Sequence, residues 1–339
     1  MEDKVFRSTT EQIEILRNRK LVITDEEKAK LILCRENYYN LINGYKDVFL
    51  KSQDPEEYID GTTLDELYSL YLFDRELRSI FIKYILIIEN NVKSVIAHEF
   101  SKQYGHRDYL RTENFRTPSN NESISHRDKS QYIGDVTELI ANIHREIAHQ
   151  LKKNSTMISH YMLDFGYVPL WVLVNTLSLG TISIFYSYLK QKDQNDVARR
   201  FDLKPEVLSR FLSVLTIFRN ACAHDERLFS LKTVKNGQIK NSLKSVTLHD
   251  MLDIPKGAAG HLHGKNDLLA VVIIFKYMLT PQYFEQFFNA LEAQINELER
   301  ALHSIPIENV LKQMGFVDNG WSDWRRIKEI DPKADVEKQ

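Results

Sequence analysis

Three residues near position 220 carry side chains that could cleave a phosphodiester bond. Arg219, Asn220 and His224 form an R-N-x-x-x-H string. A histidine titrates near neutral pH and can move the proton of a ribose 2′-OH or of a leaving 5′-oxygen. An arginine can hold a phosphate and stabilise the charge that develops on its oxygens. The asparagine could fix the tautomer of the histidine or donate a hydrogen bond to the phosphate.

These residues belong to a stretch, 205–229, whose spacing predicts a long amphipathic helix. One face is apolar: Val207, Leu208, Phe211, Leu212, Val214, Leu215, Phe218 and Cys222. At about 100° per residue, Asn220, His224 and Arg227 fall on the opposite side, and Arg219 lies at the edge between the two faces. The alternative interpretation is an ordinary solvated face, because Arg and His suit the C-terminal end of a helix. An R-x4-H string arises often by chance, so these residues alone favour neither interpretation.

An earlier stretch offers a second polar pair. Residues 79–100 are apolar nearly all round, which predicts a central helix. Within it Glu89 and Lys93 are spaced i,i+4 with the acid first, so their side chains can pair. A partly exposed ion pair is one interpretation. The other is that both residues line the same site as Arg219 and His224.

A family resemblance supports the catalytic interpretation. The string at 219–224 resembles the R-N-x-x-x-H signature of HEPN-type ribonucleases. The segment from Glu89 to Lys93 is similar to the E-x-x-x-K element that such nucleases often carry on a facing helix. Further blocks resemble, in order, those of the Abi-like abortive-infection proteins of the AbiD/AbiF group: residues 37–49, 70–100 and 168–189. The match covers most of residues 10–230, and the ordered blocks are more specific than the string.

This resemblance implies an all-α, HEPN-like helical bundle and a function in bacterial phage defence or toxin–antitoxin growth arrest. The implied activity is a metal-independent endoribonuclease that needs no cofactor, because the nucleophile is the 2′-OH of the RNA. The implied catalytic residues are Arg219, Asn220 and His224, and the implied supporting residues are Glu89, Lys93 and Arg227. A small structured RNA or a protein antitoxin from the same locus is the implied restraint.

Two other functions fit the same residues. The chain could be a catalytically inactive RNA-binding or protein-interaction module that kept the fold. It could also be a helical scaffold, although that would leave the face with Arg219, Asn220 and His224 unexplained. Incubation with RNA separates the first alternative from the enzyme.

The spacing within the motif also predicts a homodimer. Arg219 and His224 are separated by about 140° around an ideal helix. One chain therefore cannot easily close both side chains on one phosphate. Two motif helices that face each other across a two-fold axis would bring two arginines and two histidines into one cleft. HEPN nucleases resemble this arrangement.

Composition restricts where RNA could bind. The 339 residues are 43% hydrophobic and 27% charged, as in a globular chain, and the formal net charge of −2 provides no global basic field. An RNA site must therefore be a local patch. Basic residues gather among aromatic ones at 101–133 and again at 190–210, a mixture that suits single-stranded RNA, although a solvated loop has the same composition. The candidate RNA-binding residues are Arg107, Arg111, Lys190, Arg199 and Arg200.

The remaining expectations concern organisation and compartment. We expect an N-terminal helical extension (1–62) with a polar linker at 51–62, a HEPN-like core (63–230), and a β-hairpin followed by a C-terminal helical lobe (231–339). Residues 101–133 should be irregular, and a helix should span 134–153. Trp171 is predicted to be a core anchor. His261 and His263 lack further metal ligands nearby, so no zinc site is expected.

A cytoplasmic location is predicted from what the sequence lacks. The N-terminus has no apolar signal segment, and no uninterrupted apolar run is long enough to span a membrane. Cys34 and Cys222 are expected to be buried thiols of a reducing compartment rather than a disulfide framework.

Overall fold

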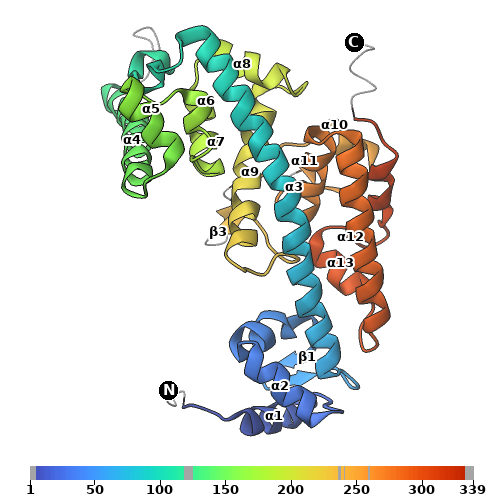
Figure 1. The fold of residues 1–339 in the computed structure, drawn as a ribbon. Coiled ribbons are helices and arrows are strands. Elements are labelled where there is room, and N and C mark those ends of the chain that lie inside the picture. The colour runs from blue at the N-terminus through green and yellow to red at the C-terminus, as the bar shows by residue number, and fades with distance from the viewer. Residues whose placement is uncertain (1–4, 118–124, 236–237, 240, 259, 333–339) are drawn as a thin grey trace.

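The fold is organised around one helix that runs through the whole molecule (Figure 1). The computed structural model describes residues 5–117, 125–235, 238–239, 241–258 and 260–332. The central helix, α3 (Leu64–Tyr104), has 41 residues and is roughly 60 Å long at about 1.5 Å per residue. Its N-terminus has a capping box, in which Thr63 Oγ1 accepts the Glu66 N–H and the Glu66 carboxylate accepts the Thr63 N–H. The sequence prediction of a central apolar helix is confirmed.

A small N-terminal unit covers the first part of α3. It contains two helices, two short helical turns and a hairpin: α1 (Thr9–Asn18), α2 (Glu26–Arg35), the turns Tyr39–Asn43 and Lys46–Phe49, β1 (Leu50–Gln53) and β2 (Glu56–Tyr58). The two strands pair antiparallel. The polar linker expected at 51–62 is therefore wrong, because most of this stretch forms a hairpin. Its Tyr58 side chain is fully buried and anchors the hairpin to the core.

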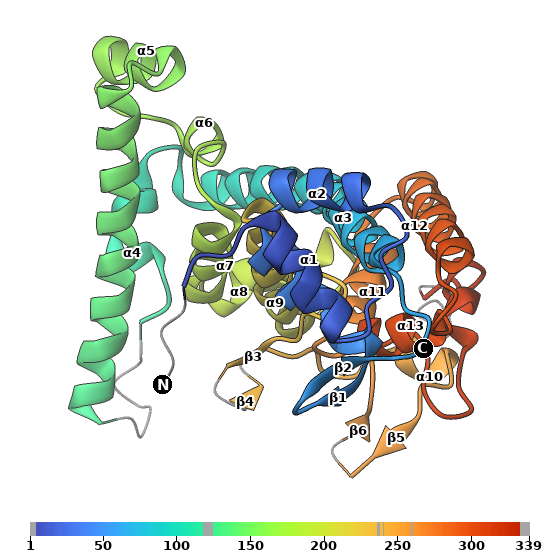
Figure 2. The same cartoon turned by 90° about the horizontal axis from the view of Figure 1, so that it is seen from below.

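Six helices lie in the described residues of the middle of the chain: α4 (His126–Lys152), α5 (Thr156–Phe165), α6 (Leu170–Leu173), α7 (Leu179–Tyr188), α8 (Gln191–Arg199) and α9 (Pro205–Ala223). Two 3-10 turns, Asp108–Leu110 and Thr112–Asn114, lie between α3 and α4. Figure 2 shows α4 along one side of the molecule, with α5 across its end. Val136, Leu139 and Ile143 of α4 are buried in the core. The prediction that residues 101–133 are irregular is wrong from residue 126 onward. There α4 begins, at His126, with Ser125 as its N-cap.

The C-terminal part adds further helices and two small hairpins: β3 (Val234–Lys235), β4 (Gln238–Ile239), α10 (Thr247–Met251), β5 (Lys256–Gly257), β6 (Gly260–His261), α11 (Leu268–Met278), α12 (Pro281–Ala301), α13 (Glu308–Met314) and a 3-10 turn at Asp323–Lys328. β3 and β4 pair antiparallel, as predicted, although the turn residues Asn236 and Gly237 lie outside the described part of the chain. The predicted all-α class with a small β-hairpin is confirmed.

α3 shares its hydrophobic core with the C-terminal helices. Its most extensive helix contacts are with α12 and then with α9. Phe81 of α3 packs against Phe275 of α11 and Phe287 of α12, with ring centroids 5.7 and 5.2 Å apart. The apolar side of α12, whose spacing suited either packing or dimerisation, is buried inside the chain.

Three apolar side chains differ from their predicted burial. Cys34 is exposed on α2, so its expected burial is wrong, and Cys222 of α9 is partly buried. Both thiols are free, and burial raises the pKa of Cys222 to about 12. Trp171 is not a core anchor, because it is 51% exposed on the short helix α6. None of the described helices is both long enough and apolar enough to cross a membrane.

Candidate active site

The helix that carries the motif, α9, is fixed by its apolar face. Pro205 occupies the first turn, and Leu208, Phe211, Leu215 and Phe218 are buried. α9 packs mainly against α3 and α7, and its Phe211 also contacts Tyr277 of α11. The helix ends earlier than the sequence pattern predicted. Its last residue is Ala223, and His224 is the C-cap residue, whose N–H donates to the Asn220 carbonyl over 3.0 Å.

Arg219 points toward α3 and meets the predicted polar pair there. Its Nε lies 3.6 Å from Glu89 Oε2, and the other oxygen, Glu89 Oε1, lies 2.6 Å from Lys93 Nζ. Glu89 is only 3% exposed and Lys93 only 6%, so the interpretation as a partly exposed ion pair is wrong. The structure therefore brings the buried Glu89 and Lys93 together with Arg219, whose side chain is 31% exposed, into one cluster. Two cations against one carboxylate leave this cluster a net charge of +1.

The guanidinium of Arg219 is oriented by charge rather than by hydrogen bonds. At 3.6 Å its Nε is too far from Glu89 Oε2 for a hydrogen bond. Both atoms are buried, and neither has a hydrogen-bond partner in the described part of the chain. An arginine whose side chain is 31% exposed and whose Nε donor is unused can bind an anion such as a phosphate.

His224 lies apart from this cluster. It lines a depression of about 470 Å³ between the end of α9, the turns at 39–47 and Tyr71 of α3. Arg219, Glu89 and Lys93 do not line this depression. The imidazole is exposed, and no described residue hydrogen-bonds to it or forms an ion pair with it. Asn220 is likewise exposed on α9. Both imidazole nitrogens are therefore open to a ligand, but one chain does not place His224 beside Arg219.

Arg227 has a structural contact that its predicted supporting role did not include. It follows the end of α9, and its Nη1 donates to the Gly44 carbonyl over 2.5 Å. The same nitrogen lies 3.4 Å from Asp47 Oδ2. Arg227 therefore ties the motif segment to the N-terminal unit, and it also lines the depression with His224.

Sequence reasoning missed the buried pair that holds the segment after the motif. Asp74 of α3 is fully buried and accepts the backbone N–H groups of Leu228 and Phe229 over 3.0 and 2.7 Å. Arg78, one turn further, lies 2.6 Å from Asp74 Oδ2 and 2.5 Å from Asp225 Oδ1. The available signal was a charged i,i+4 pair inside an apolar stripe.

The five candidate RNA-binding residues differ in their surroundings. Three of them already face carboxylates: Arg111 beside Asp108 and Glu113, Arg199 beside Asp196, and Arg200 beside Glu99. The other two face aromatic rings. Lys190 Nζ lies 5.1 Å from the Tyr104 ring centroid, and the Arg107 guanidinium lies 5.8 Å from that of Tyr167. Arg107 and Lys190 are thus the better placed of the five for nucleic acid.

The two histidines of the H-x-H segment have separate partners. His261 Nδ1 lies 2.7 Å from Ser245 Oγ, and His263 Nε2 lies 3.0 Å from Asp318 Oδ2. Among the described residues, no group of three or more His, Cys, Asp or Glu side chains could hold a metal ion.

Comparison with known families places this site in context. Residues 31–230 match the family model described as Abi-like protein, and this range is more than half of the 339 residues. The chain belongs to the Abi-like protein family. Membership indicates a role in abortive infection, the bacterial defence against phage. The range matched in this Abi-like protein includes α9 and nearly all the residues described above, and it ends just after the segment bound by Asp74. No curated protein and no solved structure matches the chain.

Proposed function

We propose that this Abi-like protein is a HEPN-type endoribonuclease. The nucleophile in the cleavage is the 2′-OH of the RNA itself. The observation that carries the proposal is the cluster in which the buried Glu89 holds Lys93 and the partly exposed Arg219 together with a net charge of +1. The exposed imidazole of His224 lies at the end of the same helix as Arg219. A cationic group for phosphate and a histidine for proton transfer are the two parts that this chemistry requires.

The reaction can be written with each atom accounted for. His224 takes the proton of the 2′-OH, and the 2′-oxygen attacks the adjacent phosphorus. The bond from phosphorus to the 5′-oxygen breaks, and the leaving oxygen receives a proton from a second imidazole. Arg219 and Lys93 stabilise the charge on the phosphate oxygens, and Glu89 orients both cations. The products are a 2′,3′-cyclic phosphate and a 5′-OH.

The products and the metal dependence test this reaction. We expect the purified protein to cut single-stranded RNA in EDTA and to leave DNA and RNA with a 2′-O-methyl group at the cut intact, because both lack the nucleophile. End-group analysis should find a 2′,3′-cyclic phosphate and a 5′-OH. A 5′-phosphate, or activity that EDTA abolishes and Mg²⁺ restores, would contradict the reaction. RNA that is bound but never cut would favour an inactive RNA-binding module.

The separation of Arg219 from His224 favours a site shared between two chains. Within one chain Arg219 faces Glu89 on α3, whereas His224 lines a different depression. A two-fold dimer can bring the Arg219 side of one copy to the His224 side of the other. It would also supply two histidines, one to accept a proton and one to donate it.

Mixing two inactive variants tests the shared site. Arg219→Ala and His224→Ala should each be inactive alone. Co-expression should restore part of the activity, because a mixed dimer contains one intact arginine and one intact histidine, and water can replace the second imidazole as the proton donor to the leaving oxygen. Light scattering should give about twice the chain mass of 39.8 kDa. A protein that cleaves at full rate as a monomer, or a mixture that stays inactive although mixed dimers form, would contradict the shared site.

A further inference from the structure

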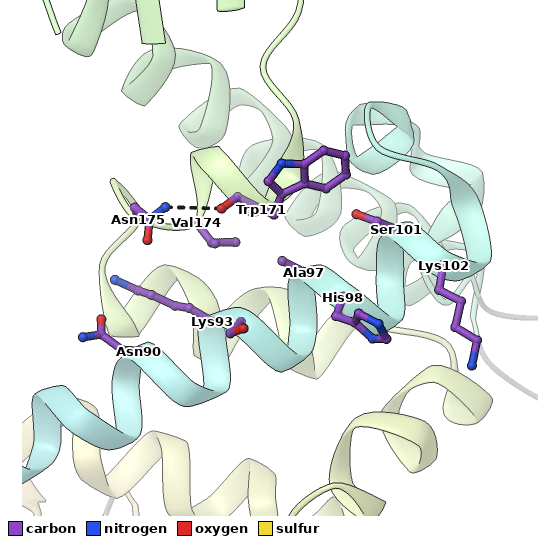
Figure 3. Close-up of a pocket in the computed structure, with 10 residues that line it drawn as sticks. Asn90, Lys93, Ala97, His98, Ser101, Lys102, Trp171, Val174 and Asn175 are labelled. Atoms are coloured by element: carbon purple, nitrogen blue, oxygen red, sulfur yellow. Dashed lines mark hydrogen bonds between the residues drawn. The ribbon is translucent and has the colours of Figure 1, made fainter. Parts of the chain in front are cut away.

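A groove begins at the cluster of Glu89, Lys93 and Arg219 and runs along α3. It has a volume of about 540 Å³ and lies between α3 and the segment that contains α6. Lys93, which pairs with Glu89, is part of its lining. Figure 3 shows the Lys93 side chain extending from α3 into the space between the two helices, with Trp171 on the opposite side. The groove therefore leads directly to the cluster that contains Arg219.

The lining of the groove is cationic and contains no carboxylate. Lys93, His98 and Lys102 line it from α3, and its other polar residues are serines and asparagines. His98 and Lys102 are exposed. Glu99 lies 3.3 Å from His98 Nδ1 and 3.9 Å from Lys102 Nζ, but it is not part of the lining. A groove with positive charge and amide groups but no acid is complementary to a polyanion.

Trp171 forms the aromatic wall of this groove. The chain has three tryptophans. Trp321 and Trp324 are 6% and 0% exposed, whereas Trp171 is 51% exposed. Its position is fixed by the backbone, since the Leu170 N–H donates to the His106 carbonyl over 3.0 Å and Asn175 Nδ2 donates to the Trp171 carbonyl over 3.2 Å. A large flat ring is thus presented to solvent from a fixed backbone.

The exposed ring continues into a row of aromatic side chains. Ring centroids are 6.1 Å apart between Trp171 and His106, 5.0 Å between His106 and Tyr167, and 6.4 Å between Tyr167 and Phe165. The Arg107 guanidinium lies 5.8 Å from the Tyr167 centroid. Aromatic rings in series with interspersed cations are the arrangement on which single-stranded nucleic acids bind, because bases stack on rings and cations hold phosphates.

We propose that the groove and the aromatic row form one binding track for single-stranded RNA, with Trp171 stacking on a base. The track would deliver the strand to Lys93 and Arg219, so the inference rests on the proposed nuclease function. A duplex is a poorer ligand, because its bases are already stacked and paired. The two lysines in the groove lining, Lys93 and Lys102, favour RNA over a protein partner, because lysine binds phosphates and is depleted at protein–protein interfaces.

The exposure of Trp171 allows a direct test by fluorescence. The full-length His224→Ala chain, which should not cut RNA, is titrated with an oligouridylate and with an RNA duplex of equal length. We expect saturable quenching by the single strand and little by the duplex, because the other tryptophans are buried. Trp171→Phe should remove the quenching but keep the affinity measured by anisotropy. Trp171→Ala should bind roughly 5- to 150-fold more weakly, from the strength of one base–ring stack.

Tyr283 provides a matched control, because it is 42% exposed on α12 and does not line the groove. Tyr283→Ala should leave affinity unchanged. Unchanged affinity in Trp171→Ala, equal quenching by the duplex, or no quenching by any RNA would overturn the track, and the last result would favour a protein partner. Failure of the nuclease proposal would give a different result. RNA would still quench the fluorescence of Trp171, but the wild-type chain would leave the RNA uncut.

Discussion

Replacing His224 with alanine should abolish RNA cleavage and growth arrest without unfolding the protein. Loss of a general acid–base group lowers rates by about 10²- to 10⁴-fold. The imidazole is exposed and has no hydrogen-bond partner among the described residues, so the free energy of unfolding should change by less than about 0.5 kcal/mol. Cleavage of a labelled RNA, urea unfolding and growth after induced expression measure the three effects.

A second histidine provides the control for this substitution. His144 is exposed on α4 and, like His224, has no partner in the described part of the chain. His144→Ala should therefore keep full activity and toxicity. A folded His224→Ala protein that remains equally toxic would remove His224 from the mechanism.

The sequence predicted the helices that build the site and one of its key contacts. The apolar spacing in α3 and α9 is a clear helix signal, because each helix buries at least one of its sides. The i,i+4 spacing placed Glu89 beside Lys93, and the structure adds Arg219 to this pair. Spacing could not show that the pair is buried, since an exposed pair and a buried pair have the same pattern.

Two wrong predictions, the irregular segment up to residue 133 and the burial of Trp171, have the same physical cause: the residues concerned are exposed to solvent. The first turns of α4, up to residue 131, are mostly exposed and need no apolar face, so their sequence is as polar as that of a loop. Trp171 was assigned to the core because it is large and apolar, but α6 has only four residues and turns the ring outward. Hydrophobic periodicity reports buried faces, so it could predict neither the exposed first turns of α4 nor the exposed Trp171 ring.

The role of Asp74 and Arg78 could not be read from spacing either. Their partners lie about 150 residues later, in the carboxylate of Asp225 and the backbone of Leu228 and Phe229. Backbone donors leave no mark on the sequence, because every non-proline residue has one. The short hairpin β1–β2 was missed for a related reason, since strands of four and three residues are too brief for a clear alternation.

Replacing Asp74 with alanine should destabilise the protein strongly, because this carboxylate has four buried partners: the Tyr45 hydroxyl, Arg78, and the N–H groups of Leu228 and Phe229. The substitution would leave the buried Arg78 without its 2.6 Å partner and the N–H groups of Leu228 and Phe229 without an acceptor. Removing one member of a buried ion pair costs about 3 to 5 kcal/mol. Urea or thermal unfolding should show this loss.

Asp65 on the same helix provides a matched control for Asp74. Each aspartate pairs with one cation, and the main difference between the two pairs is that Asp74 is buried and Asp65 is not. Asp65 Oδ1 lies 2.6 Å from Lys28 Nζ, the same distance as in the Asp74–Arg78 pair, but its side chain is 48% exposed whereas that of Asp74 is fully buried. Asp65→Ala should therefore cost about 1 kcal/mol or less. Hydrogen exchange locates the effect: amides of 224–230 should lose protection in Asp74→Ala and keep it in Asp65→Ala. Equal losses of stability in the two variants, or unchanged protection after Asp74→Ala, would show that Asp74 does not hold the segment that carries His224.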